Sequence, residues 1–233
     1  MFHFSDGEII LIDKEINWTS FDVVNYLKPA IQEFEEKKHG IKGKIKIGHA
    51  GTLDPLATGL LILCTGKKTK DIQKLMDLRK TYIGTFCLGA TTASFDKEQP
   101  IHQTFDISSI TEEMIHSVTK NFIGKQLQVP PVFSAVRVRG KRAYELVRQN
   151  VEVELKPKPI EIYRFEITNI RLPYVDFMIE CSKGTYIRAI ARDFGHALNN
   201  GAYLENLRRA KIGEYDVNDA MKVREFLNLI KRM

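Results

Sequence analysis

Apolar residues in the first third of the chain follow a strand-like run and then a helix-like period. Residues 8–14 contain four consecutive apolar side chains and predict a β-strand. The next apolar residues recur three or four positions apart, which predicts a helix with one buried face and with Thr19 or Ser20 as its N-cap. These apolar residues are Val23, Val24, Leu27, Ile31 and Phe34. We expect Pro29 to kink or split the helix, and the charged segment 35–46 to be a surface connection.

Strands and short helices alternate in the middle of the chain. The apolar run 60–64 predicts a buried strand, and residues 79–88 predict a second strand after a short helix. The polar segment 89–110 predicts a loop. Thr111 is a suitable N-cap for the helix that follows, and Gly124 is a suitable residue to end it.

The C-terminal part of the chain predicts two strands followed by a helix. Residues 156–171 are rich in isoleucine, and residues 174–182 alternate apolar and polar side chains, as a strand with one buried face does. A helix is predicted to begin at residues 184–185, and residues 207–209 are predicted to form a turn that leads into a strand. Because no repeat or linker is evident, residues 1–233 are predicted to form a single mixed α/β domain of the α+β type.

Composition and charge narrow the class of protein. The 233 residues are 43% hydrophobic and 27% charged, which is typical of a soluble globular protein with a substantial core. The net charge of +6 indicates a polyanionic partner such as nucleic acid, although many basic proteins bind none. The N-terminus has no basic start or long apolar core, and no stretch reaches about eighteen apolar residues, so neither a signal peptide nor a membrane span is predicted.

The three cysteines are scattered along the chain at Cys64, Cys87 and Cys181. None of them forms a CxxC pair, so the sequence indicates neither a zinc site nor a disulfide framework. Each cysteine stands in an apolar run and is expected to be a small buried residue, which predicts a reducing, cytoplasmic location.

Residues 48–61 are the stretch around which the candidate chemistry is organised, and their sequence is GHAGTLDPLATGLL. Gly48 and Gly51 allow the backbone to turn and to approach a partner closely. Pro55 fixes its own φ and pushes Asp54 into an extended conformation, so the carboxylate is held on a stiff turn that leads into a core strand. This arrangement suits catalysis. The alternative is a turn in which Asp54 only binds nearby backbone amides.

Two basic segments are candidates for contact with a nucleic-acid backbone. Residues 66–69 read GKKT, but a phosphate-binding loop needs Gly where Leu61 stands and Ser or Thr where Lys68 stands. Lys67 therefore either contacts RNA or belongs to a solvated charged face. The proline-containing segment 128–135 leads into a short helix through a group of cationic residues flanked by aromatic ones. These cations are Arg137, Arg139, Lys141 and Arg142. The mixture fits an RNA-contacting flap, and a solvated basic hairpin is the alternative.

Arg188 and Arg192 lie four positions apart and share a face of the predicted helix. Both fall in its first two turns, where a cation does not complement the positive end of the helix dipole. This placement favours a specific anionic partner for Arg188. The alternative is an ordinary surface arginine.

The stretch 48–61 resembles the signature of the TruB-type tRNA pseudouridine synthases, GHxGxLDPxAxGxL, at every defined position. The family's Leu-Gly-x-x-Thr-x-Thr-x-Asp loop is matched by residues 88–96, with Ser94 in place of the second Thr. Its Arg-Tyr element is matched at Tyr82. Its flap, helix-entry and late elements are matched by PPVFSA at 130–135, KGTYIR at 183–188 and LRR at 207–209.

The match is weaker near the start of the chain. The family's Lys-Pro-x-Gly-x-(Thr/Ser)-Ser element corresponds to residues 14–20, where Glu15 replaces the proline and Asn17 replaces the glycine. The resemblance nevertheless covers nearly the whole chain. It implies the pseudouridine synthase fold, a large, mostly antiparallel, bent sheet flanked by helices and loops, with an RNA-contacting flap at about residues 128–155.

The resemblance also implies the reaction. The uridine at position 55, in the T-loop of tRNA, would be detached from its sugar, turned and rejoined through carbon to give pseudouridine. Since nothing is oxidised and no group is donated, no cofactor and no metal are implied. The implied partner is the T-arm stem-loop of tRNA, bound by a monomer, with no membrane involved.

Several site residues carry roles that the resemblance implies. Asp54 would be the catalytic carboxylate, kept ionised in its pocket by the guanidinium of Arg188. The target base must leave its stack. Tyr82 would stack against the extruded base, and His49 would help to fill the space that the base leaves.

The remaining implied roles are supporting ones. Tyr186 would form a hydrogen bond near Asp54 or pack the pocket, Asp96 would orient a basic side chain, and Lys14 would contact a phosphate or support the pocket floor. Arg208, Lys67 and the cations of the flap would contact RNA.

Many bacterial members of the family carry a C-terminal PUA domain, which the sixteen residues after Val217 cannot form. We therefore expect a minimal enzyme that relies on its catalytic domain and its flap. Two alternatives stay open: a synthase that acts on another RNA or under a guide RNA, and a non-catalytic RNA-binding or RNA-folding protein. The presence of Asp54, Tyr82 and Arg188 disfavours the second alternative.

Overall fold

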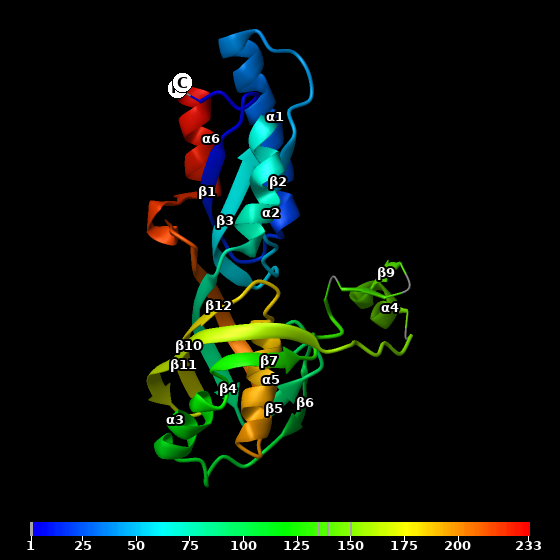
Figure 1. Ribbon diagram of the computed structural model, residues 1–233, viewed down its shortest axis with the longest axis vertical. Helices are drawn as coiled ribbons and strands as arrows, with labels where there is room; N and C mark the ends of the chain where they lie inside the picture. The colour runs from blue at the N-terminus through cyan, green and yellow to red at the C-terminus, as the bar shows by residue number, and fades with distance from the viewer. Residues whose placement is uncertain (1, 135, 139, 150) are drawn as a thin grey trace. The chain divides into compact units, whose positions relative to one another are not determined.

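The chain forms two compact units (Figure 1). A computed structural model describes residues 2–134, 136–138, 140–149 and 151–233. The first unit combines residues 1–82 with residues 208–233, and the second unit contains residues 83–207.

The first unit contains a sheet with the strand order β14-β1-β3-β12, in which β2 pairs with β3 and β13 pairs with β12. Its elements are β1 (Ile9–Lys14), α1 (Ser20–His39), β2 (Ile47–His49), β3 (Ala57–Thr65), the 3-10 helix η1 (Gly66–Asp71), α2 (Ile72–Asp77), the first residues of β4 (Lys80–Leu88), the last residues of β12 (Ala202–Ile212), β13 (Tyr215–Asp216), the 3-10 helix η2 (Val217–Asp219), β14 (Met221–Lys222) and α6 (Val223–Arg232). The antiparallel pairing of β1 with β3 places Lys14 opposite Gly59.

Helix α1 begins where the sequence predicts, but Pro29 does not split it. Thr19 is the N-cap, and its hydroxyl and the carboxylate of Asp22 form a reciprocal capping box. The helix continues through Pro29 to His39 because its apolar face packs into one core on both sides of the proline, which offsets a loss of about 3 kcal/mol. The predicted surface connection therefore begins later than residue 35.

The second unit contains a sheet with the strand order β12-β4-β11-β10-β7, together with two separate two-stranded sheets. Its elements, besides β4 and β12, are β5 (Ala90–Thr92), β6 (Ile101–Thr104), α3 (Glu112–Lys120), β7 (Gly124–Gln128), β8 (Arg137–Val138), β9 (Lys141–Arg142), α4 (Ala143–Arg148), β10 (Lys158–Arg171), β11 (Tyr174–Cys181) and α5 (Ile187–Ala197). The rings of five phenylalanines pack against one another and form an apolar core in this unit. Its members are Phe86, Phe122, Phe165, Phe177 and Phe194.

Four expectations about local structure are wrong. The predicted loop 89–110 contains the hairpin of β5 and β6, whose second strand is fully exposed and so carries no apolar alternation. Residues 207–209 belong to strand β12 rather than to a turn, because the side chain of Arg209 is buried and that of Arg208 is paired with Asp13. Helix α5 begins at Ile187, not at residues 184–185, and α3 ends at Lys120, before Gly124.

The predicted mixed α/β class, with a large and mostly antiparallel sheet, is confirmed. All three cysteines are buried and free. Among the described residues, no helix is both long enough and apolar enough to cross a membrane.

Candidate functional site

The turn that carries Asp54 joins β2 to β3 in the first unit. Its ends are fixed by backbone hydrogen bonds, from the N–H of Ala50 to the carbonyl of Ile62 (2.9 Å) and from the N–H of Ala57 to the carbonyl of Asp54 (3.0 Å). Asp54 is half-buried, and the strand that follows it is almost entirely buried. The carboxylate is thus presented at the edge of a rigid core, as the sequence predicts.

Two buried side chains from other elements hold the residues on either side of Asp54. The hydroxyl of Ser20 accepts a hydrogen bond from the N–H of Leu53 (2.9 Å) and donates one to its carbonyl (3.3 Å). The ammonium of Lys14, which is 0% exposed, donates to the carbonyls of Trp18 (2.6 Å), Glu15 (3.1 Å) and Pro55 (3.4 Å). Lys14 therefore supports the turn through these hydrogen bonds. This arrangement suits the predicted role of supporting the pocket floor rather than that of contacting a phosphate.

Asn17, which replaces the glycine of the family's N-terminal element, adopts a backbone conformation that suits glycine. Its φ of +67° lies in the left-handed region, where glycine is at ease and asparagine is among the best-tolerated other residues. Its N–H donates to the carbonyl of Pro55 at 2.8 Å. The substitution therefore keeps a backbone conformation that fastens the Asp54 turn.

Arg209 is a further support of the turn, and the sequence analysis assigned it no role. Its guanidinium is almost fully buried and donates to the carbonyls of Leu60 (2.8 Å) and Gly51 (2.9 Å). Gly59 is needed for the close packing, because a Cβ there would lie 2.4 Å from the carbonyl oxygen of Arg209. The only signal for this role in the sequence is the match of residues 207–209 to the family's late LRR element.

His49 lies on β2, five positions before Asp54, with its side chain half-buried. Burial lowers the pKa of its imidazole, and the neighbouring charge of Arg209 lowers it further. His49 is consequently neutral at pH 7. A neutral imidazole can pack against a base, as the resemblance implies, without adding a positive charge to the site.

Lys14 makes the stability of the protein depend on pH. Burial lowers the pKa of its ammonium to about 8 from the usual 10.5, despite the opposing effect of the Asp54 charge. Between these pH values the unfolded chain holds more protons than the folded one, so the free energy of unfolding rises with pH. We expect wild type to gain up to about 1.4 kcal/mol per pH unit over Lys14→Met in this range. Urea unfolding of both proteins at pH 7, 8, 9 and 10 measures this; a flat or falling difference would contradict it.

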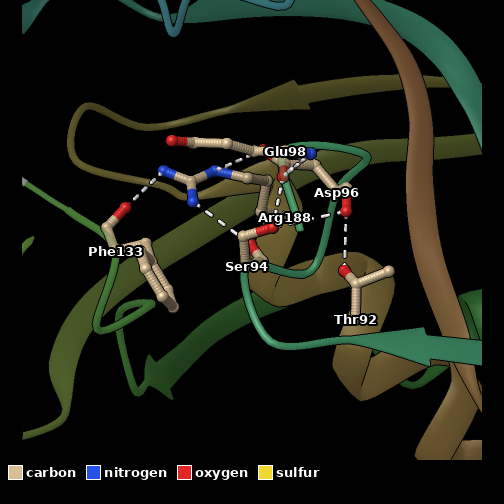
Figure 2. Close-up of polar contacts among 6 residues, drawn as sticks. All are labelled: Thr92, Ser94, Asp96, Glu98, Phe133 and Arg188. Atoms are coloured by element: carbon tan, nitrogen blue, oxygen red, sulfur yellow. Dashed lines mark hydrogen bonds and ion pairs between the residues drawn. The ribbon is translucent and has the colours of Figure 1, made fainter. Parts of the chain in front are cut away.

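A second group of predicted residues surrounds the guanidinium of Arg188 in the second unit (Figure 2). Arg188 is 4% exposed and donates to the carbonyls of Phe133 (2.9 Å) and Ser94 (3.2 Å). Its Nε lies 3.6 Å from a carboxylate oxygen of Asp96, which itself accepts from the hydroxyl of Ser94 (2.5 Å) and the N–H of Glu98 (2.9 Å). A buried guanidinium thus joins the loop after β5 to the entry of the flap.

The loop that supplies these partners has an uncommon backbone. Phe95, between Ser94 and Asp96, has a φ of +63°, which a bulky residue rarely adopts. Its ring lies under the guanidinium of Arg192, 5.0 Å from the ring centroid, and its carbonyl accepts from the N–H of Leu204 (2.9 Å). The surrounding contacts therefore fix a conformation that turns the neighbouring Asp96 toward Arg188.

Tyr186 is placed by a residue that the sequence analysis did not single out. The side-chain amide of Gln128, which is 3% exposed, accepts from the N–H of Tyr186 (2.8 Å) and donates to its carbonyl (3.1 Å). Gln128 ends β7, and only Val129 separates it from the two prolines of the flap. Its amide thus ties the start of the flap to the N-cap of α5.

The predicted RNA-binding cations differ in how exposed they are. Arg137 and Lys141 are exposed on the short hairpin of β8 and β9, whereas Arg139 lies outside the described residues and the side chain of Arg142 is not described. Lys67 is exposed and pairs with Asp6 at 3.0 Å. Arg208 is half-buried and makes a two-pronged pair with Asp13 (2.9 Å for each contact), so the charge that it would offer to RNA is partly neutralised.

The predicted site residues divide between the two units. The first unit holds Asp54, His49, Lys14 and Tyr82, the last of which is buried in β4; the second unit holds Arg188, Asp96 and Tyr186. The pairing of Asp54 with Arg188 stays a prediction. Among the described residues, no group of three or more His, Cys, Asp or Glu side chains is placed to hold a metal ion.

Residues 37–187 match the N-terminal domain of the TruB family pseudouridylate synthases. The tRNA pseudouridine synthase B of Flavobacterium johnsoniae is 50% identical over 221 residues, which are 95% of this chain and 95% of that protein. That of Phocaeicola vulgatus is 49% identical over 224 residues, which are 96% of this chain and 93% of that protein.

Solved structures agree with these sequence matches. A chain in the crystal structure of a Cbf5-Nop10-Gar1 complex is 25% identical and superposes with a TM-score of 0.70 over 97% of this chain. This protein spans only 55% of that solved chain. The sequence matches, the fold and the rigidly held aspartate agree, and this chain belongs to the TruB family of pseudouridylate synthases, which are isomerases that convert uridine to pseudouridine.

Proposed function

We propose that this chain isomerises the uridine at position 55, in the T-loop of tRNA, to pseudouridine, with Asp54 as the catalytic carboxylate. The observation that carries the proposal is the fastening of the Asp54 turn. Ser20 and Lys14 hold the residues before and after the aspartate, and Arg209 holds the start of the turn. A carboxylate fixed in this way can meet a reacting nucleotide without first having to be ordered.

The other predicted residues take supporting roles in this proposal. Tyr82 stacks on the extruded base, and neutral His49 packs in the space that the base vacates. The pairing of Arg188 with Asp54, in which a guanidinium would offset the effect of burial on a carboxylate, is part of this proposal. Asp96 holds the guanidinium of Arg188 in place, which is consistent with their 3.6 Å separation.

The choice of substrate rests on the relatives and on charge. The similar proteins of Flavobacterium johnsoniae and Phocaeicola vulgatus are named as tRNA pseudouridine synthases, and they are matched over nearly their full length. The net charge of +6 and the exposed cations of the flap suit a polyanion. We further propose that the protein acts as a monomer in the cytoplasm, on the T-arm stem-loop.

Mapping of the product tests the proposal directly. Pure protein is incubated with an unmodified tRNA transcript and with an isolated T-arm stem-loop, and pseudouridine is located by mass spectrometry after chemical labelling. We expect one pseudouridine in both RNAs, at position 55, without a guide RNA. A transcript with cytidine at position 55 is the matched control. Product at another position, or only with added RNA, would contradict the proposed substrate.

A further inference from the structure

A basic hollow in the first unit is lined by residues of η1 and of the connection between α1 and β2. Its volume is about 480 Å³. We call it the lysine hollow, because five of its lining residues are lysines. These are Lys42, Lys44, Lys46, Lys67 and Lys70. No aspartate or glutamate is among its lining residues.

The lysines of the hollow come from two segments of the chain. Lys42, Lys44 and Lys46 lie in the segment that enters β2, which bends at Gly43. Ile45, between two of them, is buried in the core and also lines the hollow. Lys67 and Lys70 are three positions apart on η1, where residues at this spacing stand above one another.

The floor of the hollow is rigid. The N–H of Gly66 donates to the carbonyl of Lys46 (2.9 Å), which joins the two lysine-bearing segments. A Cβ at Gly66 would lie 2.2 Å from the carbonyl oxygen of Ser5, so the N-terminal segment is packed directly against η1. The hydroxyl of Thr69 closes the first turn of η1 by donating to the carbonyl of Gly66 (2.7 Å). These contacts anchor the backbone at Lys46 and along the first turn of η1.

The positive charge of the hollow is largely uncompensated. Lys67 pairs with Asp6 and Lys42 lies 3.8 Å from Glu36, but all four side chains are more than half exposed. Such surface pairs contribute only about 0–1 kcal/mol and exchange readily for another anion. For Lys44, Lys46 and Lys70, the described part of the chain supplies no ion pair.

We propose that the lysine hollow binds phosphate groups of the tRNA backbone, outside the loop that enters the Asp54 site. This inference rests on the proposed function, because it names a second contact for the same substrate. Strand β3 begins three residues after Asp54 and ends at Thr65, next to the hollow. A nine-residue strand spans about 26 Å, so the hollow lies about one strand length from the catalytic turn along the same unit.

The chemistry of the hollow favours a polynucleotide over a single small anion. Ammonium groups on flexible stems act as point charges and do not fix one anion in one orientation, as an arginine fork does. A row of lysines instead follows a chain of evenly spaced phosphates and releases its counterions. The hollow should therefore add affinity for tRNA without affecting the chemical step.

The test replaces Lys44, Lys46 and Lys70 with alanine in the full-length protein. A matched control replaces Lys38, Lys120 and Lys231 with alanine. These lysines are exposed and do not line the hollow, and their replacement removes the same total charge. Binding of full-length tRNA and of a short T-arm hairpin is measured from 50 to 200 mM salt, and turnover is measured at saturating tRNA. Binding is read independently of turnover, so a wild-type protein without synthase activity would refute the proposed function and leave this test intact.

We expect the hollow variant to bind full-length tRNA at least about tenfold more weakly, with the slope of log K against log salt reduced by about three. Its kcat should stay within twofold of wild type, and its affinity for the short hairpin should not change. Full-length tRNA affinity within twofold of wild type, or equal to that of the control, would overturn the proposal. Equal losses for the hairpin and for tRNA would overturn the placement of the contact outside the loop.

Discussion

Asp54→Asn is expected to lower kcat for pseudouridine formation by at least about 10³-fold, while the Kd for tRNA stays within threefold of wild type. Asparagine has nearly the same shape as aspartate but carries no negative charge, so the reaction loses its anionic group. The turn itself should persist, because Ser20 and Lys14 hold the backbone at Leu53 and Pro55. Single-turnover formation of pseudouridine and a filter-binding titration measure the two quantities.

Asp219→Asn is the matched control for this prediction. Asp219 is exposed in η2 of the same unit, and its replacement changes the net charge equally. We expect the control to have wild-type activity and both variants to unfold at the wild-type urea concentration. Appreciable turnover by Asp54→Asn would show that another group supplies the chemistry.

Arg188→Met is expected to lower the free energy of unfolding by about 3–5 kcal/mol. The substitution leaves the buried carboxylate of Asp96 without its cation, and it leaves the carbonyls of Ser94 and Phe133 without a donor (Figure 2). Activity should fall as well, because Phe133 in the flap loses its hydrogen bond to α5. Urea unfolding monitored by circular dichroism gives the stability change.

Replacing Asp96 as well, which removes the unpaired carboxylate, should restore part of the lost free energy of unfolding. In Arg188→Met/Asp96→Asn, the asparagine oxygen can still accept from Ser94 and from the N–H of Glu98. We expect the double variant to be more stable than Arg188→Met, and the two changes to be non-additive. A loss below about 1 kcal/mol for Arg188→Met, or strict additivity in the cycle, would mean that the buried pair contributes little.

Elements with a strong local signal were predictable from the sequence. The N-cap and apolar period of α1 and the alternation along β11 arise from neighbouring residues, so a single pass along the chain finds them. The hairpin of β5 and β6 was missed because its second strand is exposed throughout and has no buried face to reveal. The effect of Pro29 was misjudged because the packing that carries α1 past it comes from other parts of the chain.

The sequence by itself determined the identity of the turn residues and the stiffness that Pro55 gives to Asp54, since both depend on adjacent positions. Only the tertiary structure decided what holds the turn. Lys14 reaches Pro55 across 41 positions and Arg209 reaches Gly51 across 158. Likewise, in the second unit, Arg188 reaches Ser94 across 94 positions. A buried cation that finds its carbonyl partners at such distances leaves no local pattern, because the contact exists only after the strands have paired.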